Sequence, residues 1–209
     1  MRLQCEKDRL LTAVQIVQKA TATKTTLPIL TGIYLIASDG MLELQATDYE
    51  VGISITIPAE VMEPGKVVLS GKFCPEIIRK ISGKIIEISS VPQSSMVTIA
   101  AEKTEFKILS FPADEFPTIK KIESNNSIII KDDMLKDLIR KTVFACSTDE
   151  SRPLFTGALM EVADSMITMV ATNTHRLALK KNLLSEPSSS LKMIIPGKLL
   201  VEIAKIITF

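Results

Sequence analysis

Residue types that commonly carry out chemistry are sparse in this chain of 209 residues, and their spacing fits no catalytic pattern. Histidine occurs once, at His175, so a metal site built on histidines has no second ligand of that type. The segment GKVVLSGKF at 65–73 is superficially like a phosphate-binding loop, but five residues separate its glycines instead of four. Phe73 also stands where a Ser or Thr would bind magnesium. We therefore expect no catalytic site, no metal and no cofactor.

Cysteines and acidic pairs fit ordinary structural roles. Three widely spaced cysteines give no disulfide or metal-ligand pattern, which favours a reduced cytosolic protein: Cys5, Cys74 and Cys146. Two acidic pairs are interpreted as solvated turn residues rather than catalytic carboxylates: Asp48 with Glu50, and Asp149 with Glu150. The opening segment MRLQCEKDRLL contains no cleavage signal, and no apolar run has membrane length, so we expect no membrane association.

Positive charge is concentrated in the segments expected to be helical. The whole chain has a formal net charge of only +1, which argues against a simple basic nucleic-acid binder. Four windows, however, hold fourteen basic and six acidic residues, which leaves −7 for the rest of the chain: 7–24, 72–84, 131–141 and 198–205. Helices lining one surface would give it a potential suited to phosphates, although ordinary solvated helix faces explain the bias equally well.

The chain repeats itself, and the repeat defines the expected domains. Residues 28–47 align with 153–172 without a gap at an offset of 125, with seven of twenty positions identical. At an offset of 126, residues 67–81 align with 193–207. We expect a first domain at 1–118, a linker at 119–127 and a second domain at 128–209. The second copy has no counterpart of the last three strands of the first, so we expect the natural chain to continue.

Each copy is itself expected to be double, with the order strand, helix and three strands. Apolar residues at helical spacing predict the first helix: Leu10, Ala13, Val14 and Val17. Alternating isoleucines predict a strand over 51–57. The order restarts with a strand at 67–70, a helix at about 72–81 and three further strands. The sequence therefore predicts an α+β fold in which pairs of helices pack on antiparallel sheets.

Several separated segments resemble one family. TLPILTGIYLIASDGMLELQATDYEVGI (26–53), FPADEFP (111–117), STDESRPLFTG (147–157) and ATNTHRLA (171–178) resemble the beta subunit of bacterial DNA polymerase III, the sliding clamp. The resemblance implies the DNA-clamp fold, with three similar domains per chain and two chains closing head-to-tail into a ring around duplex DNA. We expect the third domain to lie outside these 209 residues. It implies a homodimer for the full-length protein, and we expect this fragment to be monomeric.

The resemblance also implies a pocket for short peptide motifs of the replicative polymerase, the clamp loader and repair proteins. The matching positions are Phe155, Thr172, Thr174, His175, Arg176 and Leu177. Phe155 and Leu177 can supply an apolar floor, and Arg176 an aliphatic wall with a charged tip. Taken without the resemblance, a simple surface pair is the favoured interpretation of His175 beside Arg176, because exposed polar residues are common. The chain departs from the family at Thr174, where Gly or Ser is usual, and has Asn173 where Asp is common.

Two further surfaces follow from the resemblance. Basic residues on helices and loops are expected to contact DNA: Lys24, Lys80, Arg140, Lys141, Arg152 and Lys198. Ring closure is expected to use an edge strand containing Phe106 and Ile108, with Ile78 on the neighbouring helix.

Two other classes remain as alternatives. A sheet-rich nucleic-acid-binding module acting alone would use exposed stacking aromatics, but the chain has only two Tyr and seven Phe. A small cytosolic enzyme is disfavoured by the missing catalytic constellation. An assay of turnover on nucleotides separates that class from a binding protein.

Overall fold

A computed structural model describes residues 1–23, 25–91, 94–117, 119, 127–185 and 190–207. The chain forms two compact units, Met1–Lys121 and Ile122–Phe209. Most of the predicted linker, 119–127, lies outside the described residues.

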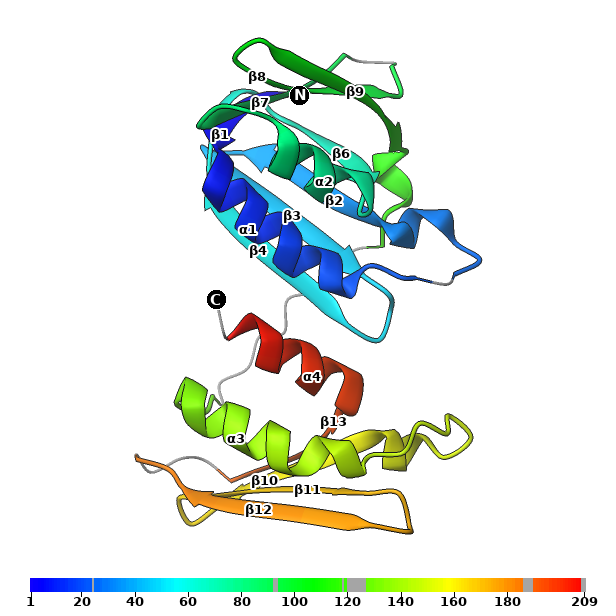
Figure 1. Cartoon of the computed structure of the whole chain (residues 1–209), viewed down its shortest axis with the longest axis vertical. Helices are drawn as coiled ribbons and strands as arrows, with labels where there is room; N and C mark the ends of the chain where they lie inside the picture. Colours follow the sequence, from blue (N-terminus) through cyan, green and yellow to red (C-terminus); the bar gives the residue numbers. More distant parts are fainter. Residues whose placement is uncertain (24, 92–93, 118, 120–126, 186–189, 208–209) are drawn as a thin grey trace. The chain divides into compact units, whose positions relative to one another are not determined.

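The first unit is built on one antiparallel sheet with the strand order β4-β3-β2-β6-β9-β8-β7-β1-β5 (Figure 1). The helices α1 (Lys7–Val17) and α2 (Phe73–Lys80) contact each other, and lie side by side in the view. The strands are β1 (Arg2–Glu6), β2 (Gly32–Ser38), β3 (Met41–Thr47), β4 (Gly52–Pro58), β5 (Glu60–Glu63), β6 (Gly65–Ser70), β7 (Ile85–Ser90), β8 (Met96–Ala101) and β9 (Thr104–Phe111). Every strand predicted in this unit is present, and β5 is an additional one.

The first strand of each half of this unit joins the sheet of the other half. Strand β1 precedes α1 but pairs with β7, whereas β6 precedes α2 but pairs with β2. Each half therefore contributes one strand to the sheet of the other half, so the two halves share one core. That core is aliphatic, as the low aromatic content predicts. Leu10, Ala13, Val14 and Val17 of α1 are all buried, as their spacing predicts.

The second unit has a four-stranded antiparallel sheet in the order β12-β11-β10-β13. Its helices α3 and α4 contact each other, and α3 contacts β11 and β12 while α4 contacts β13 and β10. The elements are α3 (Asp132–Thr142), β10 (Gly157–Ala163), β11 (Met166–Thr172), β12 (Leu177–Leu183), β13 (Leu191–Pro196) and α4 (Gly197–Ile206). The counterpart of β1, residues 127–131, is not a strand, and Ile129 is 83% exposed. The predicted α+β class, with helix pairs on antiparallel sheets, is confirmed.

The repeat is visible in the local geometry of both units. A 3-10 turn precedes β2 at Pro28–Thr31 and precedes β10 at Pro153–Thr156. In each turn the threonine hydroxyl donates to the carbonyl oxygen of the proline, at 2.7 Å in the first unit and 2.8 Å in the second. The aligned sequence segments thus fold in the same way.

A close approach explains the glycine that follows each turn. A Cβ on Gly157 would lie 2.6 Å from Cγ2 of Ile194 and 2.9 Å from the carbonyl oxygen of Ile195. A Cβ on Gly32 would meet Cγ1 of Val68, the counterpart of Ile194 in the alignment. Glycine therefore lets the first strand of each sheet reach its neighbour.

We predict that Gly157→Ala destabilises the second unit by about 1–3 kcal/mol, because the new methyl group overpacks against Ile194 and the backbone. The matched control is Gly52→Ala, where the new Cβ would lie 3.4 Å from its nearest neighbour, a side-chain carbon of Ile119. Urea unfolding measures both free energies. Equal, small effects of the two substitutions would contradict the close approach at Gly157.

Candidate functional site

Most of the candidate site residues lie on the surfaces of the two units. Among them, no three His, Cys, Asp or Glu side chains are grouped so that they could hold a metal ion. Within the same part of the chain, no helix is both long and apolar enough to span a membrane. The candidate site is therefore built from three surfaces: a turn at one end of the second sheet, basic residues on the helices and an open strand edge.

The turn between β11 and β12 is held by its own side chains. The carboxamide oxygen Oδ1 of Asn173 accepts hydrogen bonds from the backbone N–H groups of His175, at 3.2 Å, and Arg176, at 3.0 Å. The Thr172 hydroxyl donates to the Arg176 carbonyl at 2.8 Å and accepts from the Thr174 N–H at 3.2 Å. These bonds fix the backbone from which the exposed side chains of the turn project.

The first unit contains the same turn between β3 and β4. Oδ1 of Asp48 accepts from the N–H groups of Glu50, at 3.1 Å, and Val51, at 2.8 Å. The Thr47 hydroxyl oxygen accepts from the Tyr49 N–H at 3.0 Å. Asn173 thus stabilises its turn in the same way as Asp48, because the Oδ1 oxygen of each residue accepts hydrogen bonds from two backbone N–H groups. The departure from Asp at this position leaves the shape of the turn unchanged.

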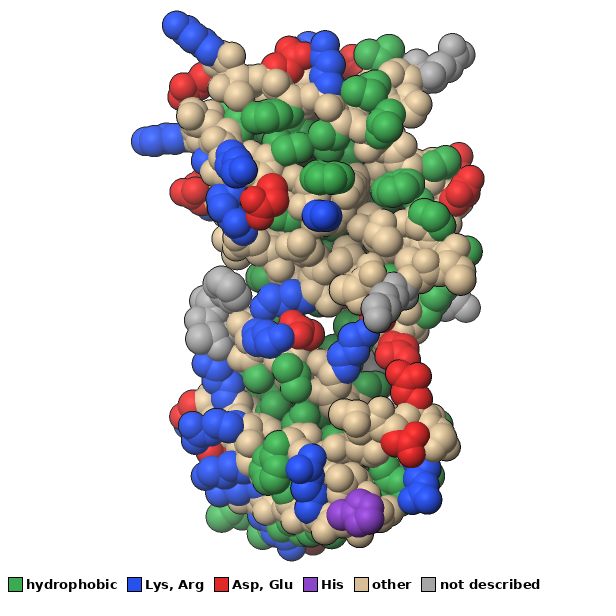
Figure 2. Space-filling view, turned by 45° about the vertical axis from the view of Figure 1, so that its right-hand side comes forward, with side chains coloured by type: hydrophobic (Ala, Val, Ile, Leu, Met, Phe, Trp, Pro, Cys, Tyr) green, Lys and Arg blue, Asp and Glu red, His purple; other side chains and the backbone are tan. Residues whose placement is uncertain are grey.

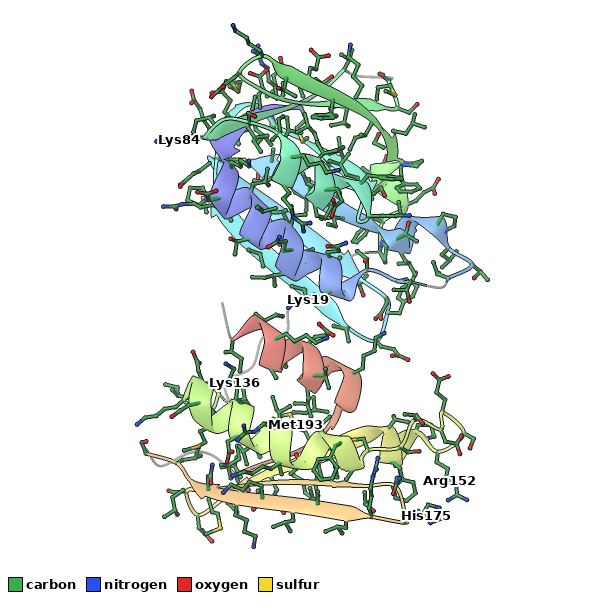
Figure 3. The ribbon with its side chains drawn as sticks, viewed as in Figure 1. Lys19, Lys84, Lys136, Arg152, His175 and Met193 are labelled. Carbon is green, nitrogen blue, oxygen red and sulfur yellow. The ribbon has the colours of Figure 1, made fainter. Side chains whose placement is uncertain are left out.

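Apolar side chains are exposed at the same end of the second unit. Leu177, which begins β12, is 67% exposed, and Leu154 of the turn before β10 is 72% exposed. Antiparallel pairing places the start of β10 at the end of the sheet where β11 finishes, so Phe155 and Thr172 share that end. Figure 3 shows Arg152 and His175 there as well. The structure therefore places all six predicted pocket residues at one end of the sheet, with Phe155 and Thr172 half-buried and the others exposed.

Sequence reasoning missed two exposed apolar residues at this end. Leu154 is the counterpart of Ile29, which is buried in the first unit, and because both residues are aliphatic the sequence carries no signal that their environments differ. Phe144, in the 3-10 turn Val143–Ala145 that follows α3, is 61% exposed. The guanidinium carbon of Arg176 lies 5.9 Å from the centre of the Phe144 ring, a cation–π contact.

Most of the predicted DNA contacts lie at helix ends. Lys80 is the last residue of α2, and Lys198 lies in the first turn of α4. Arg140 and Lys141 lie in the last turn of α3. Arg152 is exposed in the loop before the Pro153–Thr156 turn, and Lys24 lies outside the described residues. Figure 2 shows Lys and Arg side chains gathered on one flank of the second unit, with hydrophobic side chains between them.

Local ion pairs partly balance this charge. Asp137 Oδ1 lies 3.0 Å from Nζ of Lys141 and 3.4 Å from Nη2 of Arg140. The hydrogen bond from Lys141 is the largest cause that lowers the pKa of the Asp137 carboxyl. Arg140 nevertheless remains 80% exposed, so its guanidinium is accessible to a phosphate.

A groove of about 870 Å³ lies between α3 and α4 in the second unit. Apolar side chains line part of it, including Ile139, Val143, Phe144 and Val201. Charged side chains line the rest: Asp133, Lys136, Asp137, Arg140 and Lys205.

The predicted interface strand has one open edge. Strand β9 pairs with β8 from Thr104 to Leu109, but it pairs with β6 only at Ser110 and Phe111. Within the described residues, the other edge of 104–109 therefore lacks a strand partner. Phe106 and Ile108 are half-buried on this strand. The structure corrects the prediction for Ile78, which is fully buried inside the unit, so its side chain has no surface to present to another chain.

Family models match both units. Residues 1–120 match the N-terminal domain of the DNA polymerase III beta subunit, and residues 129–209 match its central domain. This chain belongs to the DNA polymerase III beta subunit family. The resemblance seen in the sequence is thereby confirmed.

Relatives of known structure show the same fold. The chain is 40% identical to the beta sliding clamp of Bacillus subtilis, an alignment that covers 99% of this chain and 57% of the relative. The crystal structure of the DNA polymerase sliding clamp from Bacillus subtilis superposes with a TM-score of 0.92, covering 99% of this chain and 56% of that chain. A putative DNA polymerase III beta subunit from Eubacterium rectale superposes with a TM-score of 0.95 at 35% identity, with 99% and 56% of the two chains covered. The chain thus spans little more than half the length of these beta subunits.

In this beta-subunit chain, Thr174 adopts a backbone conformation that favours glycine. Its φ angle is 78°, and Tyr49 at the matching position of the first unit has a φ of 72°. A β-branched residue is strained in the left-handed region. The turn geometry therefore favours glycine, one of the two residues that the resemblance implies at this position.

We predict that Thr174→Gly raises the free energy of unfolding of the second unit by about 0.5–1 kcal/mol, because it relieves this strain. The control is Thr168→Gly in the middle of the neighbouring strand β11, which is expected to lower stability. Chemical denaturation of the two variants and the parent chain measures both changes. A loss of stability on Thr174→Gly equal to that of the control would contradict the strained turn.

Proposed function

We propose that this chain is part of a sliding clamp, a processivity factor that encircles duplex DNA and tethers a replicative polymerase without catalysing a reaction. The observation that carries the proposal is that both units match successive domains of the DNA polymerase III beta subunit. The full-length protein would act in the cytoplasm as a ring-shaped homodimer. The clamp loader and repair proteins would share the polymerase's peptide pocket.

The helix surfaces support the role in DNA binding. The basic residues Arg140, Lys141, Lys80 and Lys198 lie at helix ends, where they can contact phosphates. Arg152 adds an exposed guanidinium at the loop before β10, and Lys24 is proposed for the same role. Contacts of this kind bind phosphates weakly and independently of sequence, as a protein that slides along DNA requires.

The end of the second sheet supports the role in peptide binding. Leu177 offers an exposed apolar surface, and Phe155 lies half-buried at the same end. An apolar peptide side chain seated there would gain roughly 1.5–3 kcal/mol if it were fully buried. Thr172 and Thr174 take part in the turn, and His175 and Arg176 would meet the polar part of the peptide.

The open edge of β9 supports ring closure. An unpaired strand edge is a template for pairing with another chain, and Phe106 and Ile108 supply apolar contacts beside it. A head-to-tail interface joins two different surfaces, and the proposed partner surface belongs to the third domain of the other chain. We therefore expect the 209-residue chain to be monomeric in dilute solution.

For DNA binding, we predict that the chain binds a short duplex weakly and loses the binding steeply as salt rises, because each neutralised phosphate releases counterions. Arg140→Gln should reduce the slope of log affinity against log salt by about one. Lys192→Gln is the control, since this exposed lysine lies on β13 and contacts Glu161 at 3.4 Å. Fluorescence anisotropy at several salt concentrations measures both slopes. Tight binding that is insensitive to salt would contradict the clamp role.

For peptide binding, a suitable probe is acetyl-Leu-Asp-Leu-Phe-amide, whose apolar residues match the apolar floor and whose carboxylate matches Arg176. We predict that Leu177→Asp weakens its binding about tenfold or more, because a charge would face the apolar peptide atoms. Leu183→Asp is the matched control, since Leu183 lies on the same strand and is 69% exposed compared with 67% for Leu177. Titration followed by nuclear magnetic resonance (NMR) detects weak binding. If both variants bind as well as the parent chain, this end of the sheet is not the site.

A further inference from the structure

Arg176 has an unusual environment for a residue at the end of a sheet. Its backbone is fixed, since its N–H donates to Asn173 Oδ1 and its carbonyl accepts from the Thr172 hydroxyl. Its guanidinium lies over the exposed ring of Phe144. Among the described residues, no carboxylate lies within ion-pair distance of this guanidinium.

The first unit shows that the fold itself does not require this pair. The counterpart of Arg176 in the repeat is Val51, which is 3% exposed, and the counterpart of Phe144 is Lys19. In both units the strand that precedes this turn contacts the 3-10 turn that follows the first helix. In the first unit the position that corresponds to Arg176 is occupied by the buried side chain of Val51. The second unit instead places an exposed cation over an exposed aromatic ring, so this pair lies on the surface and is not part of the core.

We propose that Phe144 is a positioning residue for Arg176, holding the guanidinium ready to pair with a carboxylate of the bound peptide. The inference rests on the peptide-binding role proposed above. It extends that role to a residue on the helix side of the unit and to a preference for acidic peptides.

The physical reason is preorganisation. A long arginine side chain loses rotamer freedom when it pairs with a ligand, and a ring that already restrains it reduces that loss. Among the described residues the guanidinium makes no ion pair, so its N–H donors are available to a carboxylate. Leucine in place of Phe144 would keep an apolar side chain but would remove the ring face.

Cys146 provides an independent reporter of where the guanidinium lies. Burial raises the pKa of the Cys146 thiol, and the positive charge of Arg176 opposes that rise. The other two thiols are buried, and burial raises the pKa of Cys5 and of Cys74 to about 12. Alkylation of the folded chain therefore reports on Cys146 alone, and a guanidinium that moves away should shift its pH profile upward.

The test uses the 209-residue chain and two peptides, acetyl-Leu-Asp-Leu-Phe-amide and its Asn analogue. Phe144→Leu should weaken binding of the Asp peptide by about five- to tenfold and remove the preference over the Asn peptide. It should also shift Cys146 alkylation to higher pH. Phe144→Tyr should restore both properties, because the ring face returns.

Two controls separate positioning from folding. Phe73→Leu removes another exposed ring with a cation over it, that of Lys72 at 5.7 Å, but in the first unit, and should change neither readout. In an Arg176→Gln chain, Phe144→Leu should have no further effect on peptide binding, because no guanidinium remains to be positioned.

The outcomes distinguish the two proposals. If the parent chain prefers the Asp peptide and Phe144→Leu changes neither affinity nor alkylation, the positioning role is overturned. If Phe144→Leu shifts the alkylation profile but the parent chain binds neither peptide, Phe144 still positions Arg176, and the peptide-binding role is overturned.

Discussion

The basic helix surface and the apolar sheet end depend on one packing constraint: each helix pair must bury its apolar stripe against a face of an antiparallel sheet. In α1 that stripe is formed by Leu10, Ala13, Val14 and Val17, all buried. Once it is buried, the remaining helix surface meets solvent and can carry cations such as Lys80 and Arg140 without desolvating them. The same packing fixes the ends of the strands, where short turns hold side chains in defined positions. Charge on the helices and an apolar site at a sheet end thus come from a single arrangement.

The two units share one fold but differ in how far the same surface is buried. In the first unit, Ile29, Leu30 and Val68 form a buried cluster with Phe116, whose ring lies 4.9 Å from that of Tyr34. Their counterparts in the second unit are Leu154, Phe155 and Ile194, which are exposed or only half-buried. In the first unit the segment that contains Phe116 therefore covers this surface. In the described part of the second unit the corresponding surface is accessible.

Much of this architecture follows from the sequence, because local patterns report local structure. Helical spacing predicted α1, alternation predicted β4, and the internal alignment predicted two similar units. Strand β5 was missed because Glu60–Glu63 is short and carries two acidic residues, and its pairing with β1 is distant in sequence. Ile78 was misplaced because an apolar helix residue looks the same in sequence whether it faces the core or a partner. Phe144 was missed because its contact with Arg176 exists only after folding brings the 3-10 turn Val143–Ala145 and the turn before β12 together.

The central claim is that one face of the second unit meets DNA while one end of its sheet meets peptides. Amide chemical-shift mapping of the isotope-labelled chain by NMR, with a short duplex and with an apolar acidic peptide in separate titrations, tests it most directly. The account predicts that the duplex perturbs α3 and α4, especially near Arg140 and Lys198, and that the peptide perturbs residues 154–155 and 172–177. Perturbation of the same residues by both ligands, or of the outer face of the sheet by the duplex, would contradict it.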